Sequence, residues 1–166
     1  REETIYTTTS GTAPVATLLF SEDCDWGGSH FLEGQKLATG PLSLNHGTAV
    51  LRMDGGAEMI LSGPVSLTLD SVGSAQLHQG NLIVRSSPKA RGFRIETPQR
   101  QIIDQGAEFS VKVDARGQTE VHCLDGEIEY RTPATTDDSP ALLAGKALRF
   151  HDQDSRGQLI TLNPLR

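Results

Sequence analysis

Residues 92–131 read GFRIETPQRQIIDQGAEFSVKVDARGQTEVHCLDGEIEYR and contain the clearest periodic pattern in the chain. Apolar and polar side chains alternate through the segment AEFSVKVD within them. Successive side chains on a β-strand point to opposite faces, so Phe109 and Val111 fall on one face and Ser110 and Lys112 on the other. The pattern predicts a strand with one buried face.

Two further strands follow the same rule. Val121 and Cys123 point inward, so His122 between them is expected on the outer face. We expect it at the surface and not in a metal site, since lone histidines seldom ligate metals. Asp125-Gly126 supplies the positive φ of a tight hairpin turn, and the residues after it return as the next strand. The sequence therefore predicts an antiparallel meander.

A fourth strand is expected just before the Thr97-Pro98 break, because Phe93 and Ile95 alternate with polar residues there. The predicted core of this region comprises Phe93, Ile95, Phe109, Val111, Val121, Ile128 and Tyr130.

Turn chemistry explains the run DQGAEF at residues 104–109. Gly106 permits a bend or bulge where the strand begins, and Asp104 can accept backbone N–H groups across it. We interpret the residues of this turn and of the later Asp-Gly turn as structural. This structural motif comprises Asp104, Gly106, Glu108, Phe109, Asp125 and Gly126.

Glycine and proline divide the rest of the chain into short runs of strand composition. Val65, Leu67 and Leu69 alternate with polar residues, and Asp54-Gly55-Gly56 reads as a turn. No window between the glycines has helical periodicity. This spacing predicts an all-β fold of about a dozen short strands in two packed sheets, like a jelly roll or a short solenoid.

The two ends of the chain differ in composition. Residues 1–13 are small and polar, and we expect a linker or a loosely held terminus there. Residues 142–150 read as a strand pair about Gly145, and residues 159–162 as a last strand. We expect residues 14–166 to form a single domain.

The chain is acidic, with 15 basic and 21 acidic side chains and a net charge of −6. This balance argues against a general affinity for nucleic acid or anionic membranes. No apolar run approaches the roughly 20 residues that span a bilayer. Because the sequence opens without methionine, we expect it to be a piece of a longer protein. Positive charge crowds at only one place, which we interpret as outward strand positions: Arg85, Lys89, Arg91, Arg94 and Arg100.

The sequence contains no recognisable catalytic or metal-binding motif. Its five histidines stand alone, and the spacings HExxH and CxxC, the calcium loop, the nucleophile elbow and the phosphate-binding loop are missing. We predict no enzyme, metal or cofactor; a hydrolase with scattered carboxylates is a weaker alternative. Cys24 and Cys123 can form a disulfide in an oxidising compartment, although Cys123 also reads as a small buried hydrophobe.

One cluster of polar and aromatic residues is a candidate ligand-binding site: Asp23, Asp25, Trp26 and His30. A tryptophan flanked by acids can stack on a sugar while the carboxylates accept its hydroxyls. Alternatively, Trp26 folds back over an apolar edge and leaves the acids in water, as is more usual for a large aromatic residue. Asp152 and Asp154 are a weaker candidate pair for calcium.

The middle and C-terminal parts of the chain resemble the FecR family, named for the regulator of ferric citrate transport. Short segments across residues 14–150 carry the resemblance: Gly63-Pro64 with the strand after it, Ala75-Gln76-Leu77, Ala90-Arg91-Gly92-Phe93, residues 104–111 and residues 121–129. The Cys24-x-Trp26 loop is similar to that of planctomycete-type bacteria, where the module often neighbours laminin-G-like domains.

The resemblance implies a periplasmic or extracellular all-β module of a membrane-anchored bacterial protein, with a membrane receptor or signalling protein as partner and a role in sigma-factor regulation. It implies no catalytic residues. The family's Gly-Thr-x-Phe motif reads Gly106-Ala107-Glu108-Phe109 here, and this chain does not contain the cytoplasmic helix, membrane span or receptor-contacting domain of those regulators. We expect a non-enzymatic sensing or protein-interaction module. The alternative is a glycan-binding or adhesion module that uses the Cys24-x-Trp26 loop.

Overall fold

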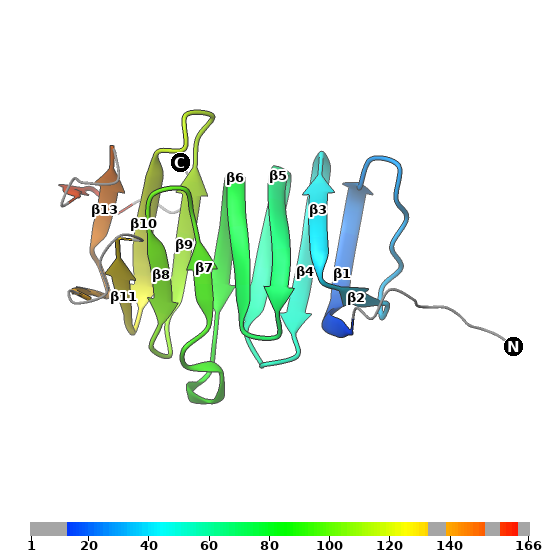
Figure 1. The fold of residues 1–166 in the computed structure, drawn as a ribbon, viewed down its shortest axis with the longest axis horizontal. Coiled ribbons are helices and arrows are strands. Elements are labelled where there is room, and N and C mark those ends of the chain that lie inside the picture. Colours follow the sequence, from blue (N-terminus) through cyan, green and yellow to red (C-terminus); the bar gives the residue numbers. More distant parts are fainter. Residues whose placement is uncertain (1–12, 133–138, 152–156, 163–166) are drawn as a thin grey trace, which may run out of the picture.

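The computed structural model describes residues 13–132, 139–151 and 157–162, which form an elongated body of strands (Figure 1). The predicted all-β class is confirmed, and the only helical segment among the described residues is the 3-10 turn η2 (Pro88–Ala90). The strands are β1 (Pro14–Asp25), β2 (Lys36–Ala38), β3 (Gly40–Leu44), β4 (His46–Met53), β5 (Glu58–Ser71), β6 (Ser74–Arg85), β7 (Arg94–Glu96), β8 (Gln101–Asp104), β9 (Glu108–Val113), β10 (Thr119–Asp125), β11 (Glu127–Arg131), β12 (Ala141–Leu143), β13 (Ala147–Phe150) and β14 (Gln158–Ile160).

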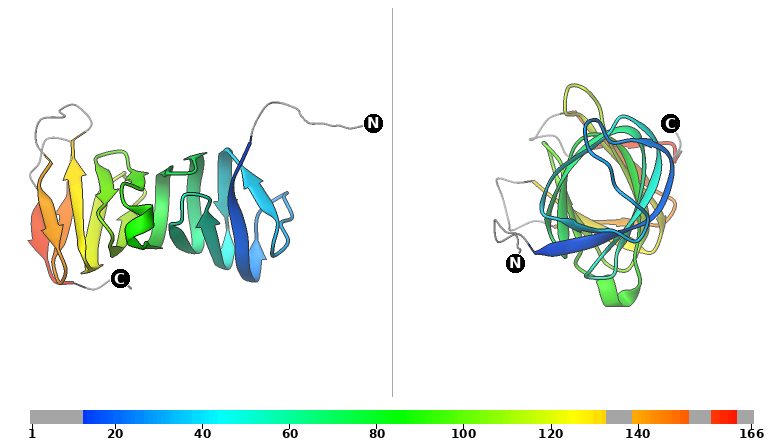
Figure 2. Two further views of the ribbon diagram at one scale, coloured as in Figure 1. Left: turned by 90° about the horizontal axis from the view of Figure 1, so that it is seen from below. Right: turned by 90° about the vertical axis from the view of Figure 1, so that its right-hand side faces the viewer.

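The strands lie in two layers, which are visible end-on in Figure 2, and the buried apolar side chains form one core. Layer 1 is the hydrogen-bonded row β2-β1-β4-β5-β6-β9-β10-β13-β14. Layer 2 is the row β3-β5-β6-β7-β8-β11-β12, in which β6 and β7 are parallel. Because β5 and β6 belong to both rows, the described strands form one 14-stranded sheet and not the two separate sheets of the prediction.

Strands β5 and β6 pass from one layer to the other at a corner built on glycine. The register of their pairing shifts between Ser62 and Ser66. Beside this shift, a Cβ added to Gly80 would lie 2.7 Å from the Cα of Val65. Gly80 also has a φ of +117°, which side-chain-bearing residues rarely adopt. The corner therefore requires glycine at position 80.

The predicted hairpin between β9 and β10 is confirmed. Val111 lies opposite Val121 in the antiparallel register. The Oδ1 atom of Asp114 accepts the backbone N–H groups of Arg116 at 2.9 Å and Gln118 at 3.0 Å, which closes the turn. The expected fourth strand is also present, as β7.

The predicted hairpin at Asp125-Gly126 is wrong. Gly126 does have a positive φ, of 76°. However, β10 pairs with β9 and β13 in layer 1, whereas β11 pairs with β8 and β12 in layer 2. The turn therefore carries the chain between layers. The strands expected about Gly145 also form, as β12 and β13, but they do not pair with each other. An Asp-Gly turn sets the local backbone angles and leaves the choice of neighbouring strand to the packing.

The predicted core residues of this region pack together. Phe93, Ile95, Phe109, Val111, Val121 and Ile128 are buried. Tyr130 is partly buried and packs against the core, with its ring centroid 5.5 Å from that of Phe150. The period-two pattern thus identified the inward face correctly.

His122 is a correction to the prediction, because only 3% of it is exposed. Its direct neighbours across the sheet are Ser110 on β9 and Ala147 on β13. These small side chains leave room for the imidazole on the outer face of layer 1. The Nε2 atom lies 3.2 Å from Oε1 of Glu120, so the ring has a polar partner.

Arg100 is a second correction, since it is buried and does not belong to the exposed basic residues. Its guanidinium carbon lies 4.2 Å from the centroid of the Phe150 ring, within the range of a cation–π contact. Its Nη1 atom donates a hydrogen bond of 2.8 Å to the carbonyl oxygen of Gln99. These contacts compensate the buried charge.

The two cysteines are free thiols, so the disulfide that the sequence allowed is not formed. Within the described residues no helix is long and apolar enough to cross a membrane. Some expectations concern segments outside the described residues: the terminus at residues 1–12, part of the loop after β11 at residues 133–138, and the pair Asp152 and Asp154.

Candidate functional site

The predicted ligand-binding cluster lies at the end of β1 and in the loop that follows it. Asp23, Asp25 and His30 are exposed there. Asp25 Oδ1 accepts the backbone N–H of Gly27 at 2.9 Å and so closes the turn after the strand. Trp26 is only 7% exposed. The cluster therefore holds three solvated polar residues around a buried indole.

The surroundings of Trp26 favour its structural role. Its ring meets that of Phe31 edge-on, with centroids 5.2 Å apart, and belongs to the hydrophobic core. A ring buried in this way has no open face on which a sugar could stack. Its Nε1 atom has no hydrogen-bond partner, which is a cost of the apolar packing.

The predicted structural motif forms one compact unit from two turns. Asp104 Oδ1 accepts the backbone N–H groups of Gly106 and Ala107, both at 2.7 Å. A Cβ on Gly126 would lie 2.7 Å from the carbonyl oxygen of Gly106, so the two layer-crossing turns touch. Gln105 donates from its side chain to Glu129 at 3.0 Å across the same unit. The sequence predicted each turn, and the structure brings them together.

Burial raises the pKa of Asp104 above its usual 3.8, and hydrogen bonds from Ser86, Ala107 and Gly106 partly oppose this rise. The Ser86 hydroxyl is shared, because it also donates to the Ala107 carbonyl oxygen at 3.4 Å. The second carboxylate oxygen, Oδ2, is buried and makes no hydrogen bond of normal geometry. The folded protein therefore holds this proton more tightly than the unfolded chain does.

We expect Asp104→Ala to lower the free energy of unfolding by about 1–3 kcal/mol, because two backbone N–H groups lose their acceptor. Asp104→Asn keeps an acceptor oxygen and should cost less. Urea unfolding of both variants at pH 7 measures the difference. Equal losses in the two variants would contradict the structural role of this carboxylate.

The Asp104→Asn variant should also reveal the sign of the linkage. A raised folded-state pKa means that wild-type stability declines as pH rises through the unfolded-state pKa and levels off above the folded-state pKa. The free energy of unfolding of Asp104→Asn minus that of wild type should therefore be larger at pH 7 than at pH 3. A stability difference that stays constant between pH 3 and pH 7 would contradict this assignment.

Cys123 is unsuited to nucleophilic chemistry. Burial, followed by the negative charges of Asp125, Asp104 and Glu127, raises the pKa of its thiol to about 11. At neutral pH the group stays protonated, and a thiol is a much weaker nucleophile than a thiolate. Its Sγ atom lies 3.5 Å from the carbonyl oxygen of Gly126, at the two-turn unit.

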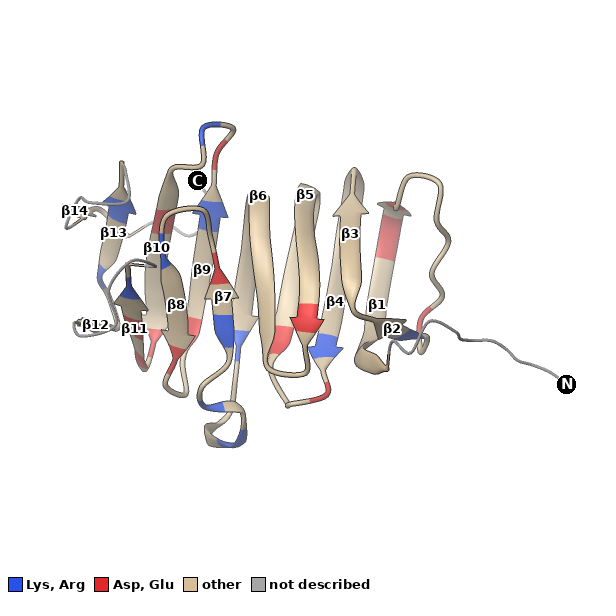
Figure 3. Ribbon diagram, in the orientation of Figure 1, with Lys and Arg blue, Asp and Glu red and all other residues tan. Residues whose placement is uncertain are grey.

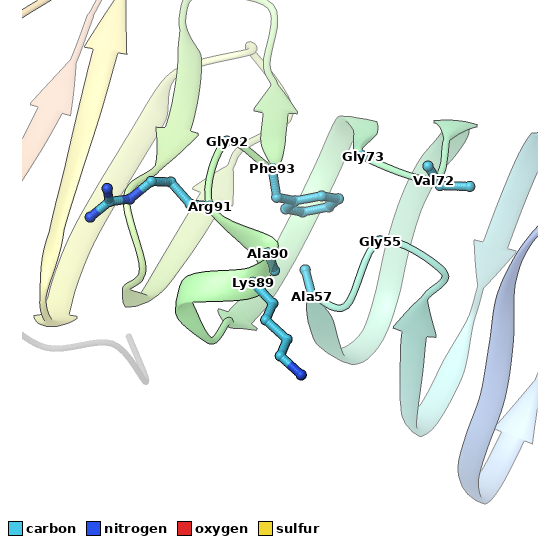
Figure 4. Close-up of a pocket in the computed structure, with 9 residues that line it drawn as sticks. All are labelled: Gly55, Ala57, Val72, Gly73, Lys89, Ala90, Arg91, Gly92 and Phe93. Carbon is cyan, nitrogen blue, oxygen red and sulfur yellow. The ribbon is translucent and has the colours of Figure 1, made fainter.

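A third feature is a pocket of about 200 Å³ beside a projecting loop, which we name the basic-loop pocket. The turn after β4 contributes Gly55 and Ala57, the β5–β6 turn contributes Val72 and Gly73, and residues 89–93 close it (Figure 4). The projecting loop carries the densest positive charge in Figure 3.

The cations beside this pocket have no side-chain partners among the described residues. Lys89, Arg91 and Arg94 are exposed and have no ion pair or hydrogen bond from their side chains in the described chain. By contrast, Arg85 meets Glu108 at 3.4 Å and Arg52 meets Glu58 at 3.5 Å.

The basic-loop pocket was not predicted as a site. Its positive charges were visible in the sequence as the crowding between residues 85 and 100. Its apolar wall was not visible in the sequence, because Ala57, Val72 and Phe93 come from separate segments that only the fold brings together. In the described ranges, no three His, Cys, Asp or Glu side chains are grouped closely enough to hold a metal ion.

Comparison with solved structures finds three chains of similar fold. Two of them are crystal structures of a proposed anti-sigma factor from Parabacteroides distasonis. One has a TM-score of 0.61 and 15% identity, and the match covers 76% of this chain and 61% of that one. The other has a TM-score of 0.59 and 17% identity, covering 75% of this chain and 60% of that one. This chain thus matches about three fifths of their length.

Comparison of the sequence with curated proteins finds no match. The model of the FecR protein family matches residues 42–129, which run from β3 into β11. This range includes the β5–β6 corner, all the residues that line the basic-loop pocket, and the two-turn unit. Because the match covers more than half of the 166 residues, the chain belongs to the FecR family.

Proposed function

We propose that this chain is a non-enzymatic, extracytoplasmic recognition module of a bacterial signalling protein, and that it acts in sigma-factor regulation by binding a protein partner. The observation that carries the proposal is the FecR family match over residues 42–129. The similar fold of the proposed anti-sigma factor from Parabacteroides distasonis supports it.

The chemistry of the described residues also favours binding over catalysis. The groups with clearly shifted pKa values, Asp104 and Cys123, are both fully buried and serve the two-turn unit. Catalytic groups must instead reach a substrate from a cleft. The basic-loop pocket offers exposed cations and an apolar wall, which suit recognition of a surface.

The glycan-binding alternative lacks support from the Cys24-x-Trp26 loop. Stacking on a sugar requires an exposed aromatic face, and Trp26 is committed to the core with Phe31. We therefore do not favour adhesion through this loop.

The proposal is tested in the source bacterium by deleting the codons for residues 14–162 in frame and profiling transcripts. We expect a defined set of genes, dependent on one sigma factor, to change expression. A matched strain carrying Phe20→Ala, which alters an exposed residue, should behave as wild type. Transcript levels unchanged by the deletion under every growth condition tried would refute the regulatory role.

A second arm of the same experiment tests the location. Alkaline phosphatase, which needs an oxidising compartment for its disulfides, is fused after residue 162 of this chain, expressed from its native gene. We expect an active fusion. An inactive but full-length fusion would refute the extracytoplasmic placement.

A further inference from the structure

The basic-loop pocket is a small, preformed recess. Phe93, Ala57 and Ala90 are buried and provide its apolar wall, while Val72 at its rim is 45% exposed. Its volume of about 200 Å³ lies below the roughly 300–1,000 Å³ that is typical of small-molecule sites. The recess therefore suits a single apolar side chain better than a whole metabolite.

Backbone hydrogen bonds hold the walls of this pocket together. The N–H of Gly55 donates to the carbonyl oxygen of Val72 at 3.3 Å, and the N–H of Arg94 donates to that of Gly73 at 3.0 Å. The N–H of Phe93 donates to the carbonyl oxygen of Ala90 at 3.2 Å. Three segments distant in sequence are thus fixed before any ligand arrives, which lowers the ordering cost of binding.

The cations around the pocket diverge. Figure 4 shows the Lys89 side chain at the pocket mouth, whereas the Arg91 side chain extends away from Phe93 on the far side of the loop. A phosphate or a single carboxylate is best bound by donors that converge on one point. Diverging cations suit negative charges spread along an extended chain.

The charge of the whole molecule argues for a protein ligand. The chain has a net charge of −6, which repels a long polyanion such as a nucleic acid beyond this patch, whereas a short acidic segment can contact the patch alone. Three cations and one exposed apolar residue also fall short of the four to eight basic residues that are typical of membrane-binding clusters. An acidic segment of a protein fits both the local cations and the apolar recess.

We propose that the basic-loop pocket binds an acidic peptide segment of a protein partner, with one apolar side chain of that segment between Val72 and Phe93 and its carboxylates against Lys89 and Arg91. This inference rests on the proposed function, because it specifies the chemistry of the partner. Recognition would combine an apolar anchor with charged contacts at the rim.

The test uses the 166-residue chain and a phage-displayed library of random 16-residue peptides. We expect enrichment of peptides rich in Asp and Glu that carry an apolar residue. The most enriched peptide, synthesised with a fluorescent label, is then titrated by anisotropy. Lys89→Glu, Arg91→Glu and Val72→Asp should each weaken its binding by about five- to tenfold. Raising the salt concentration should weaken it further.

Arg116→Glu is the matched control for the charge reversals. Arg116 is exposed on the β9–β10 turn, at the edge opposite the projecting loop (Figure 3). We expect this variant to bind within twofold of wild type. Phe20→Asp, at another exposed apolar site, is the control for Val72→Asp. Thermal unfolding verifies that all five variants are folded, as their exposed positions predict.

Three binding results would overturn the inference: no enrichment of acidic peptides, equal peptide binding by Arg91→Glu and Arg116→Glu, or wild-type binding to a DNA oligonucleotide or phosphatidylserine vesicles that is lost in Arg91→Glu. The proposed function is judged separately by the deletion strain. If the deletion changes transcription while Arg91→Glu does not, the signalling role stands and this docking site fails. If the peptides bind but the deletion leaves transcription unchanged, the docking site stands and the signalling role fails.

Discussion

Replacing Phe109 with alanine is expected to lower the free energy of unfolding by about 3–5 kcal/mol. Phe109 is 0% exposed and is among the largest fully buried side chains. It pairs with Val84 on β6 and Cys123 on β10, so its loss leaves a cavity in the middle of layer 1. A domain of this kind is stable by only about 5–15 kcal/mol, so the variant should lose a large fraction of its stability.

Urea unfolding followed by circular dichroism measures this loss. The matched control is Phe20→Ala on β1, because Phe20 is 43% exposed. We expect the control to lose about 1 kcal/mol or less, since surface substitutions are usually mild. Similar losses for both variants would show that the burial of Phe109 is not what stabilises this region.

Replacing Gly80 with alanine is expected to destabilise the fold by about 2–6 kcal/mol. Two effects add at this position. The positive φ costs a residue with a Cβ about 1–3 kcal/mol. The new Cβ would also lie 2.7 Å from the Cα of Val65 and 2.8 Å from the carbonyl oxygen of Pro64, and relief of such overpacking typically costs about 1–3 kcal/mol.

Gly73→Ala is the matched control for this corner. Gly73 lies in the β5–β6 turn, has no positive φ, and a Cβ there would meet nothing within 4 Å. We expect Gly73→Ala to be neutral or slightly stabilising, because alanine reduces the entropy of the unfolded chain. If Gly80→Ala proves too unstable to purify, its soluble yield relative to Gly73→Ala gives the comparison. A Gly80→Ala protein with the wild-type urea midpoint would contradict the described corner.

The structural motif shows which features the local sequence can predict and which it cannot. The interpretation of Asp104 as a turn acceptor was made from residue types alone, and the hydrogen bonds to Gly106 and Ala107 agree with it. Such a turn involves residues three positions apart, so its chemistry is written in the local sequence. The contact of Gly106 with Gly126 joins residues 20 positions apart, and no local sequence pattern predicts it.

The candidate binding residues show the opposite case. The sequence singled out Trp26 because acidic residues flank it, yet burial against Phe31 removes its face from solvent. The basic-loop pocket was missed because its apolar residues, Ala57, Val72 and Phe93, are each unremarkable in their own segments. Sites of this kind arise from the convergence of turns.

The sequence by itself determined where strands form, which face of each strand is apolar, and where glycine and aspartate turn the chain. These features depend on neighbours within a few residues, as in the alternation through Phe109 and Val111. Only the tertiary structure decided that β11 pairs with β8 and not with β10, that β5 and β6 join both layers, and that His122 and Arg100 are buried. Those outcomes depend on which distant strands pack together, and many pairings are compatible with the same period-two pattern.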